Sequence, residues 1–409
     1  MTYFKNLIRC QNSASFDNGF SKIGQKPDFS AKSKAAFSKT EVLKKPGTIK
    51  TWPLFFSLAV FVSCATQNPG FDEDEWLEKA NAADPALLYG THRDEQGIFF
   101  NPWMSRPTLK RNRFFFRKKR KVDDFPAEQY GPVNNTYEYL TNSGLNSISF
   151  IGHASFIIKI DGVTILTDPF FSNRALIVSK KVKIPFDFSK LPQRPVVLIS
   201  HNHYDHLDKW TVKQLVKKEA VFVVPLGLKE FFIKLGAKEV HELDWWQSTS
   251  VGTAAASSAA ANTASTSTVN FTLLPAQHWS RRLGQPAGTT LWGGFLIEGS
   301  KTIYFSGDTG YFCGFKEFGK QYTIDYALLG AGAYEPRWFM HYQHMNVAEF
   351  FRAADDLNAG TVIPMHFGII NLSDEPLVYP LHEIKLHLEK HPEYVPRTKP
   401  LRVGEFISW

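Results

Sequence analysis

Apolar stretches of strand length recur from residue 148 to the C-terminus, and segments with the helical period separate them. The strand-like stretches are Ile148–Ile151, Phe156–Ile160, Val163–Leu166, Val196–Ile199, Phe271–Leu274, Thr302–Ser306 and Thr361–Met365. Asp161-Gly162 joins the second to the third, and an Asp-Gly pair between apolar runs predicts a β-hairpin. Helical periodicity is clear at Ala348–Leu357 and Leu381–Leu388, and a further helix is expected after residue 208, with Trp210, Leu215 and Val216 on its apolar side. The pattern therefore predicts an α/β fold.

A cluster of potential metal ligands follows the apolar run that ends at Ile199. His201, His203, Asp205 and His206 fall within six positions, directly after that predicted strand. A tight turn at a strand end projects several side chains toward one point, as a divalent cation requires. Imidazole and carboxylate ligands suit Zn²⁺, with Mn²⁺ or Fe²⁺ as alternatives. The spacing also allows two ions, one held by His201 and His203 and the other by Asp205 and His206.

Three later residues of ligand type also stand just after apolar runs of strand length. They are His278, Asp308 and His366. Pro364 is unfavourable inside the last of these strands, because proline donates no ladder hydrogen bond. If all these strands end at one sheet edge, the ligands divide naturally between two ions. One ion takes His201, His203 and His278, the other takes Asp205, His206 and His366, and Asp308 bridges them.

The order of these motifs resembles the metallo-β-lactamase superfamily, and within it the phospholipases D that hydrolyse N-acylphosphatidylethanolamine. The matching segments are Asn101–Trp103, Gly152–Ser155, Thr167–Pro169, His201–Asp208, Gln277–Trp279, Leu291–Gly293, Gly307–Tyr311, Tyr334–Met340 and Tyr342–His344. The resemblance implies a four-layer αββα sandwich. The chain departs from the family pattern at Met345-Asn346 and Met365-His-Phe367, which leaves the acyl and head-group preference open.

The chain divides into three parts on this interpretation. Residues 1–64 are expected to be a disordered basic extension that ends in a signal-like segment, and residues 65–145 an irregular layer with short helices. Residues 146–409 form the predicted hydrolase domain. Within it, residues 247–268 are almost only Ser, Thr, Ala and Gly. Such a segment buries little apolar surface, so we expect an inserted flexible loop, either inert or acting as a lid.

The positive charge of the chain indicates a membrane surface as one partner. The net charge is +8, and the run Lys110–Lys121 places basic residues around three phenylalanines. Cations and aromatic rings together suit an anionic bilayer. Nucleic acid and a simple solvated loop are the alternatives for this run, and no nucleic-acid partner is expected for the whole chain. A homodimer is one option for assembly.

The cysteines Cys10, Cys64 and Cys313 suggest neither a disulfide framework nor a structural zinc site. Cys64 follows lysines and the apolar run Trp52–Val62, which resembles a bacterial lipoprotein signal whose cysteine becomes lipidated. The run is too short for a membrane-spanning helix. We therefore expect a membrane-associated lipoprotein facing the periplasm. The alternatives are a buried apolar segment and a cytoplasmic enzyme bound peripherally to the membrane.

The predicted chemistry is hydrolysis by metal-activated water. Two Zn²⁺ ions about 3.5–4 Å apart can share a water and lower its pKa to about 7, so that a bridging hydroxide attacks the substrate. No Gly-x-Ser-x-Gly nucleophile motif is present. Asp205 and Asp308 are therefore the catalytic carboxylates. His344 is expected to orient the phosphate or to protonate the leaving alkoxide.

Several other polar residues have expected supporting roles. Asp168 and Asp208 are candidates to hold ligand imidazoles through their free N–H groups, and His153 is expected to pack beneath the site. Arg281 and Arg282 would meet a lipid phosphate or stay exposed. Trp279 and Tyr311 would line an acyl channel.

The leading hypothesis is a zinc-dependent phosphodiesterase that releases phosphatidic acid and an N-acylethanolamine from N-acylphosphatidylethanolamine-like phospholipids. One alternative is another zinc hydrolase of this fold, such as a lactonase, an esterase or a nuclease. A second alternative is a non-catalytic, membrane-anchored binding protein.

Overall fold

The computed structural model describes residues 71–106, 126–133, 144–182, 187–252 and 268–409. All of them belong to one compact unit that spans Val62–Trp409. Three features predicted from the sequence lie outside the described residues: the extension 1–50, the signal-like run with Cys64, and the basic run Lys110–Lys121.

The first large sheet has seven strands and changes direction midway. In spatial order they are β10 (Glu239–Leu243), β9 (Val221–Pro225), β8 (Val196–Leu198), β5 (Val163–Thr167), β4 (Ser155–Ile160), β3 (Ser147–Gly152) and β17 (Phe406–Ser408). The strands from β5 to β10 are parallel, whereas β17, β3, β4 and β5 pair antiparallel. The predicted Asp161-Gly162 hairpin is confirmed as the β4–β5 turn.

The second large sheet has six strands. In spatial order they are β11 (Ser248–Gly252), β12 (Thr268–Leu274), β13 (Gly294–Glu298), β14 (Thr302–Phe305), β15 (Tyr326–Gly330) and β16 (Thr361–Met365). Pro364 lies in β16, opposite Leu329 of β15. The proline is tolerated because β16 is an edge strand, where one side of the backbone needs no ladder partner.

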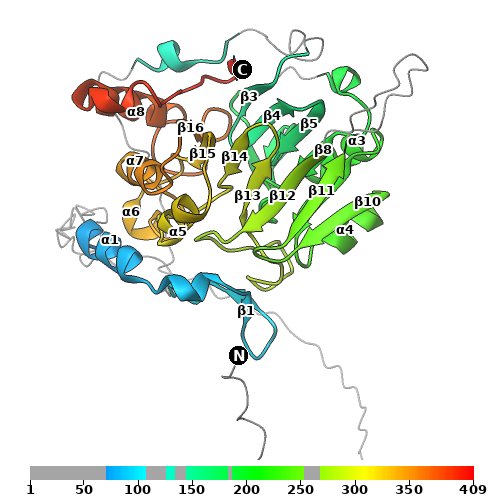
Figure 1. The fold of residues 1–409 in the computed structure, drawn as a ribbon, viewed down its shortest axis with the longest axis horizontal. Coiled ribbons are helices and arrows are strands. Elements are labelled where there is room, and N and C mark those ends of the chain that lie inside the picture. Colours follow the sequence, from blue (N-terminus) through cyan, green and yellow to red (C-terminus); the bar gives the residue numbers. More distant parts are fainter. Residues whose placement is uncertain (1–70, 107–125, 134–143, 183–186, 253–267) are drawn as a thin grey trace, which may run out of the picture. The chain divides into compact units, whose positions relative to one another are not determined.

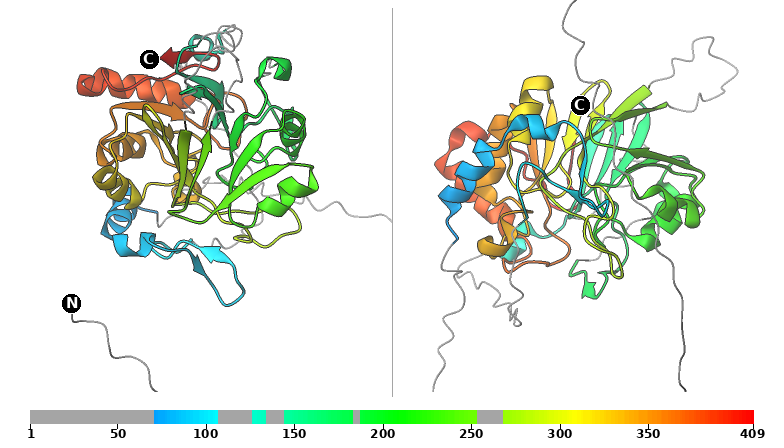
Figure 2. Two further views of the ribbon diagram at one scale, coloured as in Figure 1. Left: turned by 45° about the vertical axis from the view of Figure 1, so that its right-hand side comes forward. Right: turned by 90° about the horizontal axis from the view of Figure 1, so that it is seen from below.

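Helices cover the outer faces of both sheets (Figures 1 and 2). The short helices α3 (Lys209–Val216) and α4 (Lys229–Lys234) pack on the seven-stranded sheet through Leu215 and Phe232. The helices on the other side are α5 (Gly314–Gln321), α6 (Arg337–Met340), α7 (Val347–Asp356) and α8 (Tyr379–Lys390). The predicted four-layer αββα sandwich is confirmed.

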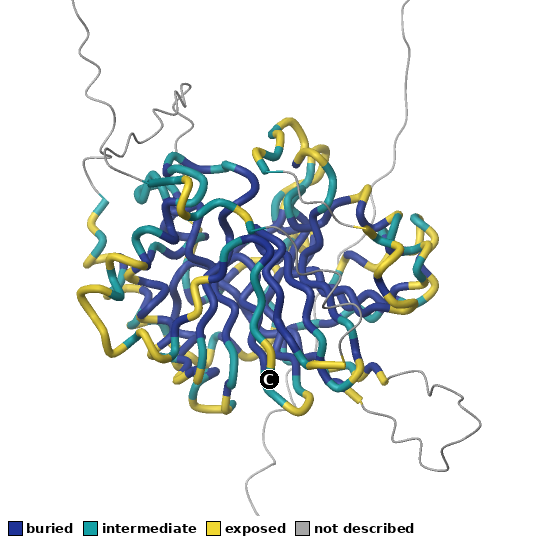
Figure 3. Tube along the Cα trace, turned by 90° about the horizontal axis from the view of Figure 1, so that it is seen from above, coloured by how far each residue is buried: buried dark blue, intermediate teal, exposed yellow. Residues whose placement is uncertain are grey.

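The core lies between the sheets and under the helices, and side chains alternate between the two places. In β8, Val196 and Leu198 face the other sheet while Val197 faces α3 and α4. This alternation follows from the two-residue repeat of a strand. Because both faces are covered, the strands are buried along most of their length, and exposure is concentrated in the turns (Figure 3).

Two local expectations differ from the structure. Trp210 was expected on the apolar face of α3, but it is 48% exposed and its ring packs edge-on against Phe188, near the start of the helix that Asp208 caps. Residues 248–252, expected in a loop, form the edge strand β11. Ser248 and Ser250 stabilise it by side-chain hydrogen bonds to Thr272 and Asn270 of β12. Residues 253–267 lie outside the described part of the chain.

The N-terminal layer is built from short elements. They are α1 (Glu73–Ala82), the 3₁₀ turns η1 (Pro85–Leu88) and η2 (Ala127–Tyr130), and the small hairpin of β1 (His92–Arg93) and β2 (Phe99–Phe100). Two further 3₁₀ turns, η3 (Phe188–Lys190) and η4 (Pro392–Tyr394), and the hairpin of β6 (Arg174–Ala175) and β7 (Val178–Ser179) complete the structure. Among the described residues, no helix has the length and apolar character that crossing a bilayer requires.

A buried ion-pair network fastens α1 to the helices of the domain. Arg337 lies 2.7 Å from Glu73 Oε1 and 2.9 Å from Glu349 Oε2, and Trp76 Nε1 donates to Glu349 Oε1 at 3.1 Å. Glu349 is 1% exposed. Burial raises the pKa of Glu349 to about 7, although Arg337 opposes the shift. The guanidinium is therefore the main charge that compensates this buried carboxylate.

We expect the substitution Arg337→Met to lower the free energy of unfolding by about 3 kcal/mol, because it leaves Glu349 buried without a counter-charge. Urea unfolding measures this loss. The matched control is Arg194→Met, which removes an exposed pair with Glu239 and should cost less than about 1 kcal/mol. Equal losses in both variants would contradict the network's role.

Candidate metal centre

The predicted ligands come together because their strands end at one edge of the sandwich. The turn His201–Asp208 follows β8, His278 follows β12, Asp308 follows β14, and His366 comes directly after Met365 of β16. The turn comes from the seven-stranded sheet and the other three residues from the six-stranded sheet. The site is therefore built by the packing of one sheet on the other.

The potential ligand atoms form four overlapping groups, each within 4.8 Å, and two of these groups contain the residues predicted for the two ions. The first contains His201, His203 and His278, with Nε2 of His201 2.8 Å and Nε2 of His278 3.3 Å from Nδ1 of His203. These are the three residues that the sequence predicted for one ion.

The second group contains Asp205, His206 and His366, as predicted for the other ion, together with His153. Nε2 of His153 lies 2.7 Å from Oδ2 of Asp205, so His153 contacts the group instead of only packing beneath it. Its backbone has φ +59°, in the left-handed region, and the amide hydrogen-bonds to Phe367 next to His366. This loop geometry was not visible in the sequence.

Asp308 lies between the two groups. Its Oδ2 is 3.8 Å from Nε2 of both His201 and His278 and 3.1 Å from Nε2 of His206. Its Oδ1 is 3.0 Å from Nε2 of His366. One carboxylate therefore faces both groups, in the bridging position predicted for it.

The arrangement fits divalent metal ions. Two nitrogens bound tetrahedrally to Zn²⁺ at about 2.0–2.1 Å are about 3.3 Å apart, close to the separations in the first group. At Asp308 and the second group, Nε2 of His206, Nε2 of His366 and Oδ1 of Asp308 are buried, and although these atoms lie close together they form no hydrogen bond of good geometry. Buried polar atoms rarely stay unpaired unless another partner, such as an ion, satisfies them.

The protonation states of the first group and of Asp308 suit metal binding, whereas His206 must first lose a proton. Burial opposes protonation of His206, but Asp308 and Asp205 outweigh it and raise its pKa well above the usual value. Burial lowers the pKa of His201 and of His278 well below the usual value, so both imidazoles are neutral with a lone pair available. Burial opposes ionisation of Asp308, but His206 and His366 outweigh it and hold the pKa of Asp308 well below its ordinary range. Neutral histidine and ionised aspartate are the forms that bind a cation.

A second layer of hydrogen bonds fixes the ligand rings. Asp168 Oδ2 lies 2.7 Å from Nδ1 of His206 and accepts from Oγ of Ser200, which lies 2.9 Å from Nδ1 of His201. Nδ1 of His278 and of His366 faces backbone carbonyls at 3.2 Å. The structure thus places Asp168 in its expected orienting position, where it sets the direction of ligand nitrogens from both groups.

Asp208 differs from the expectation that it holds an imidazole. Its carboxylate caps α3 by accepting from the amide of Trp210, and it also accepts from Ser172 and Thr211. The N-cap position directs its oxygens to backbone donors and away from the histidines. Asp208 therefore shapes the turn and holds none of the ligand rings.

Of the other residues expected to support the site, His344 and Trp279 lie beside the ligands and Tyr311 does not. His344 stacks on His366, and its Nδ1 lies 4.0 Å from Oδ2 of Asp308. Trp279 packs edge-on against His203. Tyr311 is fully buried and donates to Asn81 and Asp356, so it lines no channel at the site.

The two arginines after His278 have different environments. Arg282 donates to the carbonyls of Asn202 and Leu207 and stacks on the ring of Tyr204. Its guanidinium is therefore engaged in supporting the metal turn and is not placed to bind a lipid phosphate. Arg281 is exposed. Arg106, which sequence reasoning missed, stacks 3.5 Å from the ring centre of Trp279. No local motif marks Arg106, since only the fold brings it to this rim.

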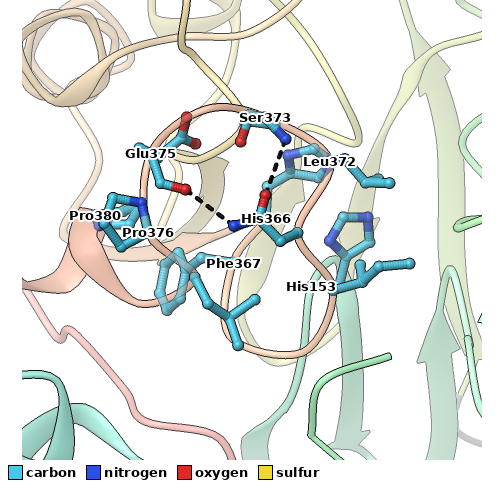
Figure 4. A pocket seen from close by; sticks show the side chains of 12 residues that line it. His153, His366, Phe367, Leu372, Ser373, Glu375, Pro376 and Pro380 are labelled. Carbon is cyan, nitrogen blue, oxygen red and sulfur yellow. Dashed lines mark hydrogen bonds between the residues drawn. The ribbon is translucent and has the colours of Figure 1, made fainter. Parts of the chain in front are cut away.

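A small recess that is partly open to solvent, with room for about one water molecule, lies beside His153 and His366 (Figure 4). The segment 370–377 forms its outer wall, and the Asn371 side chain hydrogen-bonds to the amide of Ser373 and the carbonyl of Glu375. Sequence analysis did not identify this segment, which carries no ligand motif. The pocket gives the second ligand group a wall of mixed polar and apolar character.

Comparisons with known proteins agree with this geometry. A family model described as "Beta-lactamase superfamily domain" matches residues 163–367. The chain is 30% identical over 342 residues to N-acyl-phosphatidylethanolamine-hydrolyzing phospholipase D 1 of Caenorhabditis elegans, covering 76% of this chain and 90% of that protein.

Two further similarities are more limited. A mitochondrial N-acyl-phosphatidylethanolamine-hydrolyzing phospholipase D of Saccharomyces cerevisiae is 30% identical over 253 residues, covering 59% of this chain and 51% of that protein. The crystal structure of a possible metal-dependent hydrolase from Veillonella parvula superposes with a TM-score of 0.51 at 14% identity, over 65% of this chain and all of that one. The last similarity concerns the fold alone.

We expect Asp168→Asn to weaken metal binding about 10–100-fold. Both carboxylate oxygens of Asp168 are acceptors, Oδ1 for the Ser200 amide and Oδ2 for Ser200 Oγ and His206, and an amide NH₂ group cannot replace either of them. Metal content after dialysis against a graded chelator measures the change. The control Asp208→Asn can keep the helix cap but loses the second acceptor oxygen that binds Ser172 and Thr211, and it should keep the wild-type affinity for metal. Unchanged metal retention in the Asp168 variant would contradict this role.

Proposed function

The chain belongs to the metallo-β-lactamase superfamily of metal-dependent hydrolases, and from this premise we propose that it is a zinc-dependent phosphodiesterase of the phospholipase D type. Its substrates are N-acylphosphatidylethanolamine-like phospholipids, and its products are phosphatidic acid and an N-acylethanolamine. The observation that carries the substrate class is the similarity to the nematode phospholipase over nine-tenths of that protein's length.

Two ions per chain are part of the proposal. His201, His203 and His278 would hold one, and Asp205, His206 and His366 the other, with Asp308 shared. An imidazole-rich set with carboxylates favours Zn²⁺ over Mg²⁺ or Ca²⁺, which prefer oxygen ligands. When bound, such a pair lowers the pKa of a water molecule and stabilises negative charge on phosphate oxygens.

The residues of the chain hold the reacting groups in place. His153 Nε2 donates to Oδ2 of Asp205 at 2.7 Å, which fixes that carboxylate against the second group. Most of the proposed ligands are buried, whereas His203 and Asp205 are partly exposed, so bulk water has limited access to most of the centre. Positioning of this kind is worth several orders of magnitude in rate.

His344 orients the substrate in this proposal. Burial lowers the pKa of His344 to about 3, so its imidazole is neutral at physiological pH. A neutral ring has one N–H to donate to a phosphate oxygen, but it holds no readily released proton for the leaving alkoxide. Of the two roles expected from the sequence, the geometry and charge state therefore favour orientation of the phosphate.

A membrane surface is the proposed location of the reaction, because a two-chain phospholipid resides in a bilayer. We propose anchoring through Cys64 as a lipoprotein facing the periplasm, with peripheral attachment in the cytoplasm as the alternative. The assembly state proposed with it is a monomer or a homodimer. Labelling with a radioactive fatty acid, compared between wild type and Cys64→Ser, tests the anchor.

We expect Asp308→Asn to reduce turnover of N-acylphosphatidylethanolamine by at least about a thousandfold, because the amide cannot supply negative charge to both groups. The assay measures both products from zinc-loaded protein, together with metal content and circular dichroism. Asp355→Asn, an exposed carboxylate change on α7, is the control and should keep full activity. Chelation of the wild type should abolish turnover, and readdition of zinc should restore it.

Two results would contradict the proposed function. One is absence of lipid hydrolysis by protein with both ligand groups loaded. The other is preferential turnover of lactones, carboxylic esters or nucleic acid in the same substrate panel, which would favour another hydrolase of this fold.

We expect His344→Ala to lower kcat about 10²–10³-fold at unchanged metal content, and His344→Gln to retain part of the activity through its amide N–H. Because the pKa of His344 is far below neutrality, its protonation does not change between pH 6 and pH 8. The fold-loss in the alanine variant should therefore be the same across this range. A loss that shrinks as the pH rises would instead indicate that the protonated ring acts as an acid.

A further inference from the structure

Two loop tips beside the metal turn carry the most exposed large apolar side chains of the described residues. Ile177 is 83% exposed and Leu283 is 81% exposed, whereas the next value is 50%. Leu176, next to Ile177, is 48% exposed. Single apolar side chains on a protein surface are ordinary, but two almost fully exposed apolar side chains beside one site indicate a binding partner.

The tip at Leu176 and Ile177 belongs to the β6–β7 hairpin, which continues directly from Asp168. Its base is fixed to the metal turn, because the amide of Ser172 donates to Asp208 Oδ2 at 2.8 Å. Its far strand is fixed to the loop after His366, because the amide of Lys181 donates to the carbonyl of Ile369 at 2.8 Å. The hairpin therefore stands at the rim of the second ligand group.

The tip at Leu283 follows His278 and is fixed to the same turn. Arg281 donates its amide to Asn202 Oδ1 at 2.7 Å, and Arg282 donates to the carbonyl of Leu207 at 3.0 Å. The amide of Leu283 donates to the hydroxyl of Tyr204 at 3.2 Å. Both tips are thus anchored within the segment 202–208, one on each side of it.

The hairpin turn has an unusual sequence for its geometry. Leu176 and Ile177 form the two-residue connection between Ala175 and Val178, and Leu176 has φ +50°. Such turns favour Asn, Asp or Gly, since a branched or bulky residue is strained in the left-handed region. Because Ile177 is 83% exposed and Leu176 48% exposed, this apolar pair buries little surface within the fold, which favours a contact outside the chain.

The charges around the tips are all of one sign. Residues 172–182 contain Arg174, Lys180 and Lys181, residues 279–289 contain Arg281 and Arg282, and neither segment has an acidic residue. Arg174, Lys181 and Arg281 are exposed. Apolar side chains at the end of a loop with cations behind them match the interface of an anionic bilayer, where the chains enter and the cations meet phosphates.

We propose that Leu176, Ile177 and Leu283, hereafter the docking tips, insert into the interface of an anionic lipid bilayer and present the metal centre to it. This inference rests on the proposed function and extends it, because a phospholipid substrate would enter the metal centre from the bilayer surface. A second copy of the chain fits less well, since a symmetric contact would place the same cations opposite one another.

The test compares binding to vesicles of phosphatidylcholine alone and of phosphatidylcholine with phosphatidylglycerol. Combined substitution of Ile177→Ser and Leu283→Ser should weaken binding to the anionic vesicles roughly tenfold or more. The matched control is Leu386→Ser with Val395→Ser, two apolar side chains exposed elsewhere, which should leave binding unchanged. Combined Arg174→Gln and Lys181→Gln should abolish the preference for anionic vesicles.

Activity assays separate this proposal from the proposed function. The docking-tip variant should lose turnover of vesicle-embedded phospholipid in parallel with binding, while its hydrolysis of the soluble diester bis(p-nitrophenyl) phosphate stays at the wild-type level. Equal vesicle binding by wild type and the docking-tip variant would overturn the docking surface even if lipid is hydrolysed. Tip-dependent binding without hydrolysis of either substrate would support the docking surface and remove the proposed function.

Discussion

The contact on which the site depends is that between the Asp308 carboxylate and the imidazoles of both ligand groups. Seven histidines lie within the ligand groups or against Asp308, and five of them are at most 4% exposed. Such a cluster is costly unless ions or carboxylates compensate it. Asp308 belongs to the six-stranded sheet, whereas His201 and His206 follow a strand of the other. The electrostatic balance of the site therefore depends on the packing of the two sheets, because a shift of either sheet would separate the Asp308 carboxylate from its imidazole partners.

Much of this arrangement could be predicted from the sequence, for a physical reason. His201 to His206 are contiguous, and His278, Asp308 and His366 each follow a strand-length apolar run, so a shared sheet edge brings them together. The prediction failed where the side-chain direction depended on a local cap or on packing. Asp208 turned to the amides of α3, Trp210 turned outward, and Tyr311 was enclosed by helices. Arg106 and the pocket segment 370–377 depend on contacts between distant parts of the chain, which no periodicity encodes.

The N-terminal layer contributes to the site although it supplies none of the ligands. Arg337, which binds Glu73 of α1, also donates to the backbone carbonyl of His344 at 3.0 Å. Asn101 donates to the carbonyl of His278, and Trp103 donates to Gln277 beside it. The segment that looked irregular in the sequence thus braces two of the loops on which the centre is built. Its elements are short and irregular because they pack against the loops of the metal centre and not against the face of a sheet.

The pairing of β17 with β3 has a consequence for biosynthesis. The register joins Phe406 to Ser149 and Ser408 to Ser147, so a sequence separation of more than 250 residues is closed by three short backbone pairings. While the ribosome is still making the second half of the protein, β3 has one free edge that can recruit foreign strands. The edge of β3 therefore stays unpaired until the last strand has been synthesised. A chaperone that covers this edge would matter more here than in a protein whose sheet is completed by strands adjacent in sequence.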